Sequence, residues 1–137
     1  MNQRREAAHK DLKRLLANGR LTAVPKRPAD QQLLVALAAA QMEAHRSLLE
    51  SEVNERLRSW LETISEPFGI DHVTLRRMLV DSRLLTRTTS GSTYQVNAAR
   101  MEEIDAVRGL EPLEVLAQVQ DERDLRKRQH RPELSRP

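Results

Sequence analysis

Cysteine is absent from the 137-residue chain, and the aromatic residues are reduced to three, Trp60, Phe68 and Tyr94. Without cysteine there is no disulfide, thiolate zinc site, iron–sulfur cluster or cysteine nucleophile. Proteins that bind single-stranded nucleic acid stack the bases on several exposed aromatic side chains, so this composition argues against that class. The four glycines are scattered and form no phosphate-binding loop.

Long apolar runs are also missing. The longest, residues 33–40, has eight residues, whereas a helix that crosses a bilayer needs about 20. The basic N-terminus is not followed by the apolar segment of a secretion signal. We therefore expect a cytoplasmic protein that makes no membrane contact.

Patterns that indicate catalysis or metal binding are weak. No two of the histidines, His9, His45, His72 and His130, are spaced to share one face of a helix. No nucleophile–base motif is recognisable, and the carboxylates lie among arginines as surface ion pairs do. The sequence predicts neither an enzyme nor a cofactor or metal site.

The charges are unevenly distributed along the chain. The net charge is only +3, yet residues 1–28 carry eight basic and two acidic side chains, and residues 71–100 carry five and two. Residues 29–70 and 101–137 are net acidic. Two basic stretches indicate a surface for a polyanion, although a set of solvated helix faces explains the pattern equally well.

Hydrophobic periodicity predicts a mainly helical chain. Helices are expected at residues 4–17, 28–43, 48–64, 71–82 and 98–107, and from Pro112 onward. Ser47 is the expected N-cap of the third helix and Asp71 that of the fourth. Alternating residues 20–24 predict a short strand. Two β-prone runs around Gly91 predict a hairpin in which this glycine supplies a positive φ.

The order of these elements between residues 28 and 96 is typical of a winged helix-turn-helix. In DNA-binding versions the third helix enters the major groove, and the hairpin, or wing, lies against the phosphate backbone. We expect an α+β fold, mainly α with a small β-hairpin. Its expected parts are an N-terminal helix (1–18), a winged-helix-like domain (19–97), C-terminal helices (98–128) and a tail (129–137). Charge and proline predict fraying from Arg126 onward and disorder in the tail.

Four segments resemble a bacterial protein family. They are GRL at residues 19–21 followed by Pro25 and KR at 26–27; ESEVNERL at 50–57; Asp71 followed by LRRMLVD at 75–81; and LLTR at 84–87 followed by GSTY at 91–94. In this order they resemble the DUF2087 family of small winged-helix-like domains of unknown function. Its members often follow a helix-turn-helix domain in regulators of the ArsR or MerR type. The resemblance implies a winged-helix fold over about residues 19–96 and no particular activity.

Two features depart from the family pattern. Leu48 and Leu49 stand where an aromatic and a small capping residue are usual, which moves the expected cap back to Ser47. The loop at residues 65–70 is longer than usual, and we expect this length to change the orientation of the fourth helix.

Candidate contact residues lie on the fourth helix. At about 100° per residue, Leu75, Leu79 and Val80 mark its buried side. Thr74, Arg77 and Asp81 fall on the opposite side. Arg77 is the best candidate for a base or phosphate contact, because an arginine can donate two hydrogen bonds to a guanine edge.

The positions of other residues on or near this helix indicate their roles. Arg76 lies at the edge of the buried arc and is expected to be mainly structural, paired with Glu52 or Glu55. Arg83 and Arg87 flank the wing, where they would reach phosphates without reading sequence. Structural roles are expected for Trp60 in the core, for Tyr94 across the hairpin with its hydroxyl at the rim, and for Asn54 bonded to the following loop.

The sequence favours a DNA-binding winged-helix protein, a transcriptional regulator that acts as a homodimer on double-stranded DNA, since small regulators commonly read paired half-sites. The candidate DNA-binding residues are Thr74, Arg76, Arg77, Arg83 and Arg87. The alternative is a winged-helix protein–protein interaction module without DNA binding. Convergence of Arg77, Arg83 and Arg87 favours DNA, and their neutralisation by Glu52, Glu55 or Asp81 favours a protein partner.

Overall fold

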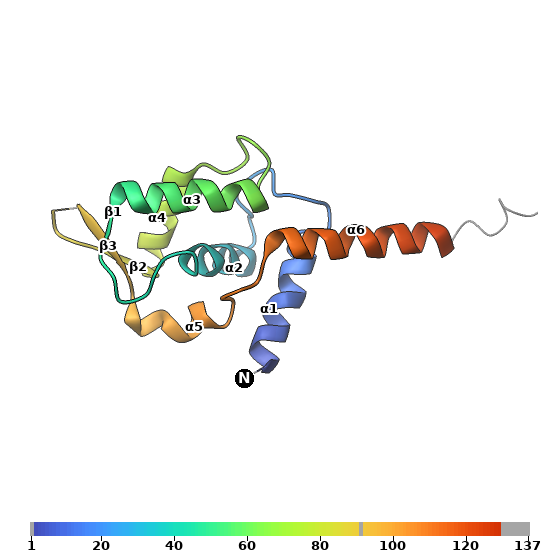
Figure 1. The fold of residues 1–137 in the computed structure, drawn as a ribbon, viewed down its shortest axis with the longest axis horizontal. Helices are drawn as coiled ribbons and strands as arrows, with labels where there is room; N and C mark the ends of the chain where they lie inside the picture. Colours follow the sequence, from blue (N-terminus) through green and yellow to red (C-terminus); the bar gives the residue numbers. More distant parts are fainter. Residues whose placement is uncertain (1, 91, 130–137) are drawn as a thin grey trace, which may run out of the picture.

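The structure is a computed structural model that describes residues 2–90 and 92–129 (Figure 1). It is mainly helical with one small antiparallel sheet, as the α+β prediction requires. The helices are α1 (Asn2–Leu15), α2 (Pro28–Ala39), α3 (Glu50–Ile64), α4 (His72–Asp81), α5 (Met101–Asp105) and α6 (Pro112–Gln129), with a short 3₁₀ helix, η1 (Ala98–Arg100), before α5. The strands are β1 (Leu48–Leu49), β2 (Leu85–Arg87) and β3 (Thr93–Val96).

Helix α2 lies at the centre of the molecule. Residues 34–39 are buried in succession, so the helix is covered on all sides rather than along one stripe. The small alanine side chains of this run let neighbouring helices approach closely, and α1, α4 and α5 all contact α2. Helix α3 instead buries the single stripe that its sequence predicts, formed by Val53, Leu57, Trp60, Leu61 and Ile64.

The sheet has the order β1-β3-β2, with every neighbouring pair antiparallel. The predicted hairpin is confirmed, because β2 pairs with β3 through Leu85 opposite Val96 and Arg87 opposite Tyr94. The prediction for Gly91 lies outside the described residues. Strand β1 was not predicted, and it brings Leu48 opposite Tyr94 on the other side of β3.

Strand β1 also explains why the predicted cap of α3 is wrong. Residues 48 and 49 are extended, so α3 begins at Glu50 and Ser47 lies outside it. The backbone N–H of Leu49 is satisfied from within the helix, by a 2.8 Å hydrogen bond to Oε1 of Glu52.

The strand predicted at residues 20–24 does not form. Only Leu21 pairs, in an isolated parallel bridge with Ser65. Its N–H donates to the carbonyl oxygen of Ile64 at 2.9 Å, and its carbonyl oxygen accepts from the N–H of Glu66 at 2.8 Å. No strand lies beside this extended segment in the described structure. It therefore forms a single bridge to the end of α3 and no ladder of paired residues.

Helix α6 packs on α1 and α3 and then extends away from the rest of the molecule (Figure 1). Lys13 Nζ reaches Glu122 Oε1 at 2.6 Å where α1 and α6 meet. Helix α6 includes residues 126–129, where fraying was predicted. The disorder predicted for the tail concerns residues 130–137, which lie outside the described residues. Basic side chains in a last helical turn complement the helix dipole. In the described part of the chain no helix has both the length and the apolar character to span a membrane.

Candidate nucleic-acid interface

Asp71 fixes the start of α4. One carboxylate oxygen accepts hydrogen bonds from the backbone N–H groups of Val73 at 2.7 Å and Thr74 at 3.1 Å, and the other accepts from Thr74 Oγ1 at 2.7 Å. The predicted N-cap is therefore confirmed. The bond from the Thr74 hydroxyl, followed by those from the backbone, holds the pKa of Asp71 below its ordinary value. The hydroxyl proton of Thr74 is thus engaged in the cap.

Arg77 lies on the side of α4 that faces solvent. Leu75 and Leu79 are fully buried on the opposite side, and the exposed residues of the helix are Val73, Thr74, Arg77 and Asp81. Within residues 2–90 and 92–129, no ion pair or side-chain hydrogen bond engages Arg77. Its guanidinium therefore keeps all of its donors available for a ligand.

Arg76 is held against α3 instead. Its Nη1 donates to Oδ1 of Asn54, and its Nη2 lies 3.8 Å from Oε1 of Glu50, with the side chain only 18% exposed. A structural role was expected, but the predicted partners Glu52 and Glu55 are wrong, because the register between the two helices places the Glu50–Asn54 side of α3 against α4. The predicted hydrogen bond from Asn54 to the following loop is also wrong, since the side-chain oxygen of Asn54 accepts its hydrogen bond from Arg76.

Glu50, which lies beside Arg76, also contacts the hairpin. The hydroxyl of Tyr94 donates a 2.7 Å hydrogen bond to Oε1 of Glu50. This bond, and next the positive charge of Arg76, hold the pKa of Glu50 below its ordinary value, with a smaller effect from Arg87. Burial first, and then the bond to Glu50, raises the pKa of Tyr94, so its hydroxyl keeps its proton. Tyr94 is buried as predicted, with its hydroxyl bonded to α3.

Arg83 follows Ser82, the C-cap of α4, and has the left-handed backbone conformation, with φ +66°. The N–H of Arg83 donates to the carbonyl oxygen of Val80, and that of Leu84 donates to Leu79, each at 3.0 Å. These are the two hydrogen bonds of a Schellman motif, whose left-handed position is usually glycine. An L-residue at such a position costs about 1–2 kcal/mol. The Arg83 side chain is exposed.

Arg87 is the exposed last residue of β2, opposite Tyr94 on β3. In the part of the chain that the structure describes, neither Arg83 nor Arg87 forms an ion pair, and Glu52 is engaged with Arg46 at 3.0 Å. Arginines therefore follow the outer side of α4, the turn after it and the adjoining strand β2. Two carboxylates lie nearby without forming a described ion pair with them: Asp81 is exposed on the same side of α4, and Glu50 is close enough to Arg87 for that charge to lower its pKa.

Sequence reasoning missed Glu50 as a member of this site. It opens the ESEVNERL segment, but its partner Tyr94 is 44 positions away, and no local pattern connects the two. Among residues 2–90 and 92–129 there is no group of three or more histidine or acidic side chains that could hold a metal ion.

A family model described as "Uncharacterized protein conserved in bacteria (DUF2087)" matches residues 20–96, more than half of the chain. The chain therefore belongs to this family, as its four sequence segments indicated. No curated protein and no solved structure matched it. The matched residues hold α2, α3, α4 and the whole sheet, and with them every candidate contact residue, whereas α1, α5 and α6 lie outside the match.

Proposed function

We propose that residues 20–96 form a winged-helix domain that binds double-stranded DNA, and that the protein is a transcriptional regulator acting as a homodimer. The order of elements supports this proposal: α2, β1, α3, α4, and then the β2–β3 hairpin, whose second strand pairs with β1. In this arrangement α4 is the recognition helix and the hairpin is the wing.

The observation that carries the proposal is the exposed Arg77 in the middle of α4. The major groove, about 12 Å wide, admits a helix, and an arginine there can donate to a guanine edge or to a phosphate. Arg76 would position α4 through Asn54 and Glu50 rather than touch the DNA. Arg83 and Arg87 would contact phosphates, which orients the protein on the duplex without selecting its sequence.

The first test is binding of the full chain to labelled random duplex DNA, followed by fluorescence anisotropy. A protein that neutralises several phosphates should lose orders of magnitude in affinity between about 50 mM and 200 mM salt. Binding with this salt dependence would support the proposal. No binding by folded protein at the lower salt concentration would overturn it and favour a protein-interaction module.

Point variants then test whether Arg77 and Arg87 contact the DNA. Once a preferred site has been selected from the random pool, Arg77→Ala should weaken binding to that site. Arg87→Ala should weaken binding to all sequences and reduce the salt slope by about 1. Arg126→Ala removes the same charge from the far end of α6 and is the matched control. If Arg77→Ala and Arg87→Ala both bind like the wild type, the interface is wrongly assigned.

A further inference from the structure

Phe68 combines an exposed side chain with a left-handed backbone. It is the most exposed of the large apolar side chains in the described ranges, at 106% of the reference area. Its backbone is left-handed, with φ +65°. An L-residue in this conformation costs about 1–2 kcal/mol, and the exposed ring gains nothing from burial. Strain combined with exposure points to a role outside the protein's own core.

The loop that carries Phe68 has a defined shape. The bridge to Leu21 holds its start, and the N–H of Gly69 donates to the carbonyl oxygen of Glu66 at 2.9 Å. A Cβ at Gly69 would lie 2.7 Å from Ser65 Oγ and 2.9 Å from the carbonyl oxygen of Leu21, so the backbone packs there without a side chain. Phe68 therefore projects from a closed, hydrogen-bonded turn.

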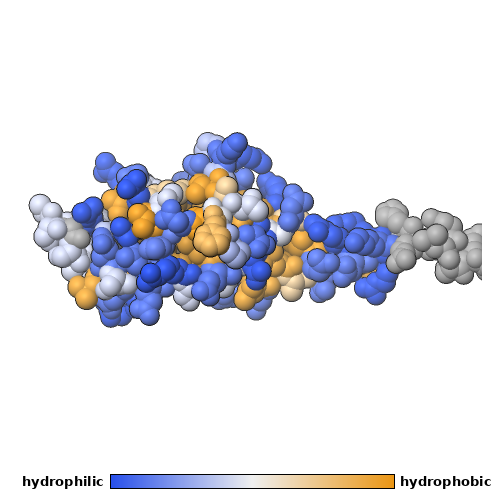
Figure 2. All heavy atoms as spheres, turned by 90° about the horizontal axis from the view of Figure 1, so that it is seen from above, coloured by the Kyte–Doolittle hydropathy of each residue, from blue (hydrophilic) through white to orange (hydrophobic). Residues whose placement is uncertain are grey.

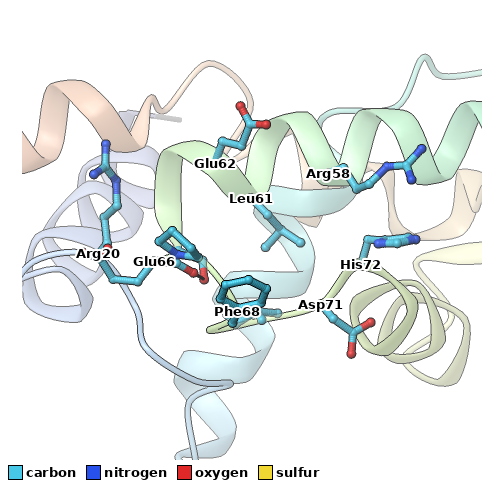
Figure 3. Close-up of a pocket in the computed structure, with 11 residues that line it drawn as sticks. Arg20, Arg58, Leu61, Glu62, Glu66, Phe68, Asp71 and His72 are labelled. Atoms are coloured by element: carbon cyan, nitrogen blue, oxygen red, sulfur yellow. Dashed lines mark hydrogen bonds between the residues drawn. The ribbon is translucent and has the colours of Figure 1, made fainter.

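A groove of about 540 Å³ opens beside this turn. Its apolar lining is Leu61, Pro67, Phe68 and Ile70. Figure 2 looks down on this side of the molecule and shows apolar side chains gathered over α3 and the loop after it. Figure 3 shows the groove between that loop and α3, with charged side chains around it. The groove is large enough to admit a second phenyl ring.

The charges around the groove bear on what can occupy it. Arg20 and Arg58 supply two positive charges, and Glu62 and Glu66 supply two negative ones. Within residues 2–90 and 92–129, none of these four forms an ion pair. Asp71, which caps α4, adds a third negative charge to the lining. A two-fold contact places one surface against an identical copy, so a surface that carries both signs can pair its positive groups with the negative groups of the other copy. A nucleic acid would require net positive charge.

We infer that this surface binds a second copy of the chain: Phe68 of each copy enters the groove of the other, and Arg58 of each faces Glu62 of the other. Arg58 and Glu62 are one turn apart on α3, so two α3 helices that cross at a two-fold axis between these positions would bring each arginine to the other's glutamate. The inference supplies an interface for the proposed homodimer and rests on that part of the proposed function. It does not require DNA binding.

The test is sedimentation velocity on the full chain without DNA, over about 1–200 µM, a range that covers dissociation constants typical of modest interfaces. The wild type should change from the mass of one chain to that of two. Phe68→Ser should raise the dissociation constant at least tenfold and leave the melting temperature of the monomer unchanged, since the ring is fully exposed. Leu125→Ser, a matched change at an exposed leucine of α6, should dimerise like the wild type.

Charge reversal tests the geometry independently. Arg58→Glu should weaken the dimer, and so should Glu62→Arg, because each places like charges together. The double variant should recover the wild-type dissociation constant, since the reversed pair attracts again. A wild type that keeps the mass of one chain at 200 µM, or a Phe68→Ser variant that dimerises like the wild type, would overturn the inference. Dimerisation by a chain that does not bind duplex DNA would support this surface while refuting the DNA-binding proposal.

Discussion

The hydroxyl of Tyr94 and the carboxylate of Glu50 are joined by a 2.7 Å hydrogen bond. Tyr94 belongs to β3, Glu50 is the first residue of α3, and Arg76 of α4 lies 3.8 Å from the same carboxylate oxygen. One carboxylate therefore contacts the hairpin and the candidate recognition helix at once. This contact connects the helix that carries Arg77 to the hairpin that carries Arg87.

Tyr94→Phe removes the hydroxyl and keeps the buried ring. We expect the melting temperature to fall by a few degrees, because Glu50 loses a hydrogen bond in a partly buried place. Thermal unfolding followed by circular dichroism measures the change. Thr89→Val removes an exposed hydroxyl from the turn of the same hairpin and is the control. Equal melting temperatures for Tyr94→Phe and the wild type would show that the bond adds no net stability.

Glu50 should make stability depend on pH. Since its pKa is lower in the folded protein than the ordinary 4.5, ionised Glu50 stabilises the fold fully above that value. This stabilisation is lost as the pH falls through the lower, folded value. The melting temperature of Glu50→Gln should therefore lie furthest below that of the wild type near neutral pH, and the difference should shrink below pH 4.5. A difference that stays constant down to pH 3 would contradict the assigned role.

Asp71→Ala removes the N-cap of α4. Loss of such a cap costs about 1 kcal/mol, and as much as about 2 kcal/mol in some proteins. Urea denaturation should show this loss as a lower midpoint with an unchanged slope. Asp81→Ala removes the same charge at the other end of the helix, where a negative charge opposes the helix dipole, so its stability should stay equal or rise slightly. Equal losses in the two variants would refute the capping role.

Arg83→Gly should move stability and binding in opposite directions. Glycine adopts the left-handed conformation without the steric cost, so we expect the free energy of unfolding to rise by up to about 1 kcal/mol. The variant also loses a side chain proposed to contact phosphate, so duplex binding should weaken and its salt slope should fall by about 1. Stabilisation with unchanged binding would remove Arg83 from the interface and leave Arg77 and Arg87 in it.

Much of the fold could be predicted because its signals are local. The apolar stripe of α3 recurs every three or four residues, and the same residues are buried in the structure. Asp71 directly precedes the helix that it caps, so the cap could be predicted from neighbouring residues alone. The hairpin pairs neighbouring segments, and its β-prone runs flank a glycine turn in the sequence.

The wrong predictions concern contacts between distant segments. Ser47 fits a capping pattern, but Leu48 pairs with Tyr94, and this pairing extends the chain up to Glu50. The partner of Arg76 depends on how α4 is aligned along α3, which periodicity does not specify. Alternation at residues 20–24 indicates extended backbone, but a ladder also needs a neighbouring strand, and the end of α3 offers Leu21 only one residue to pair with.

The contact of Glu50 with Tyr94 and Arg76 also bears on the thermodynamics of the proposed complex. A recognition helix and a wing that are joined before the encounter lose little conformational freedom when a duplex binds. The heat-capacity change of binding should then reflect the apolar surface buried at the interface, without the large additional term that accompanies folding on binding. Calorimetry at several temperatures would distinguish such a preorganised protein from one that orders its wing only on the DNA.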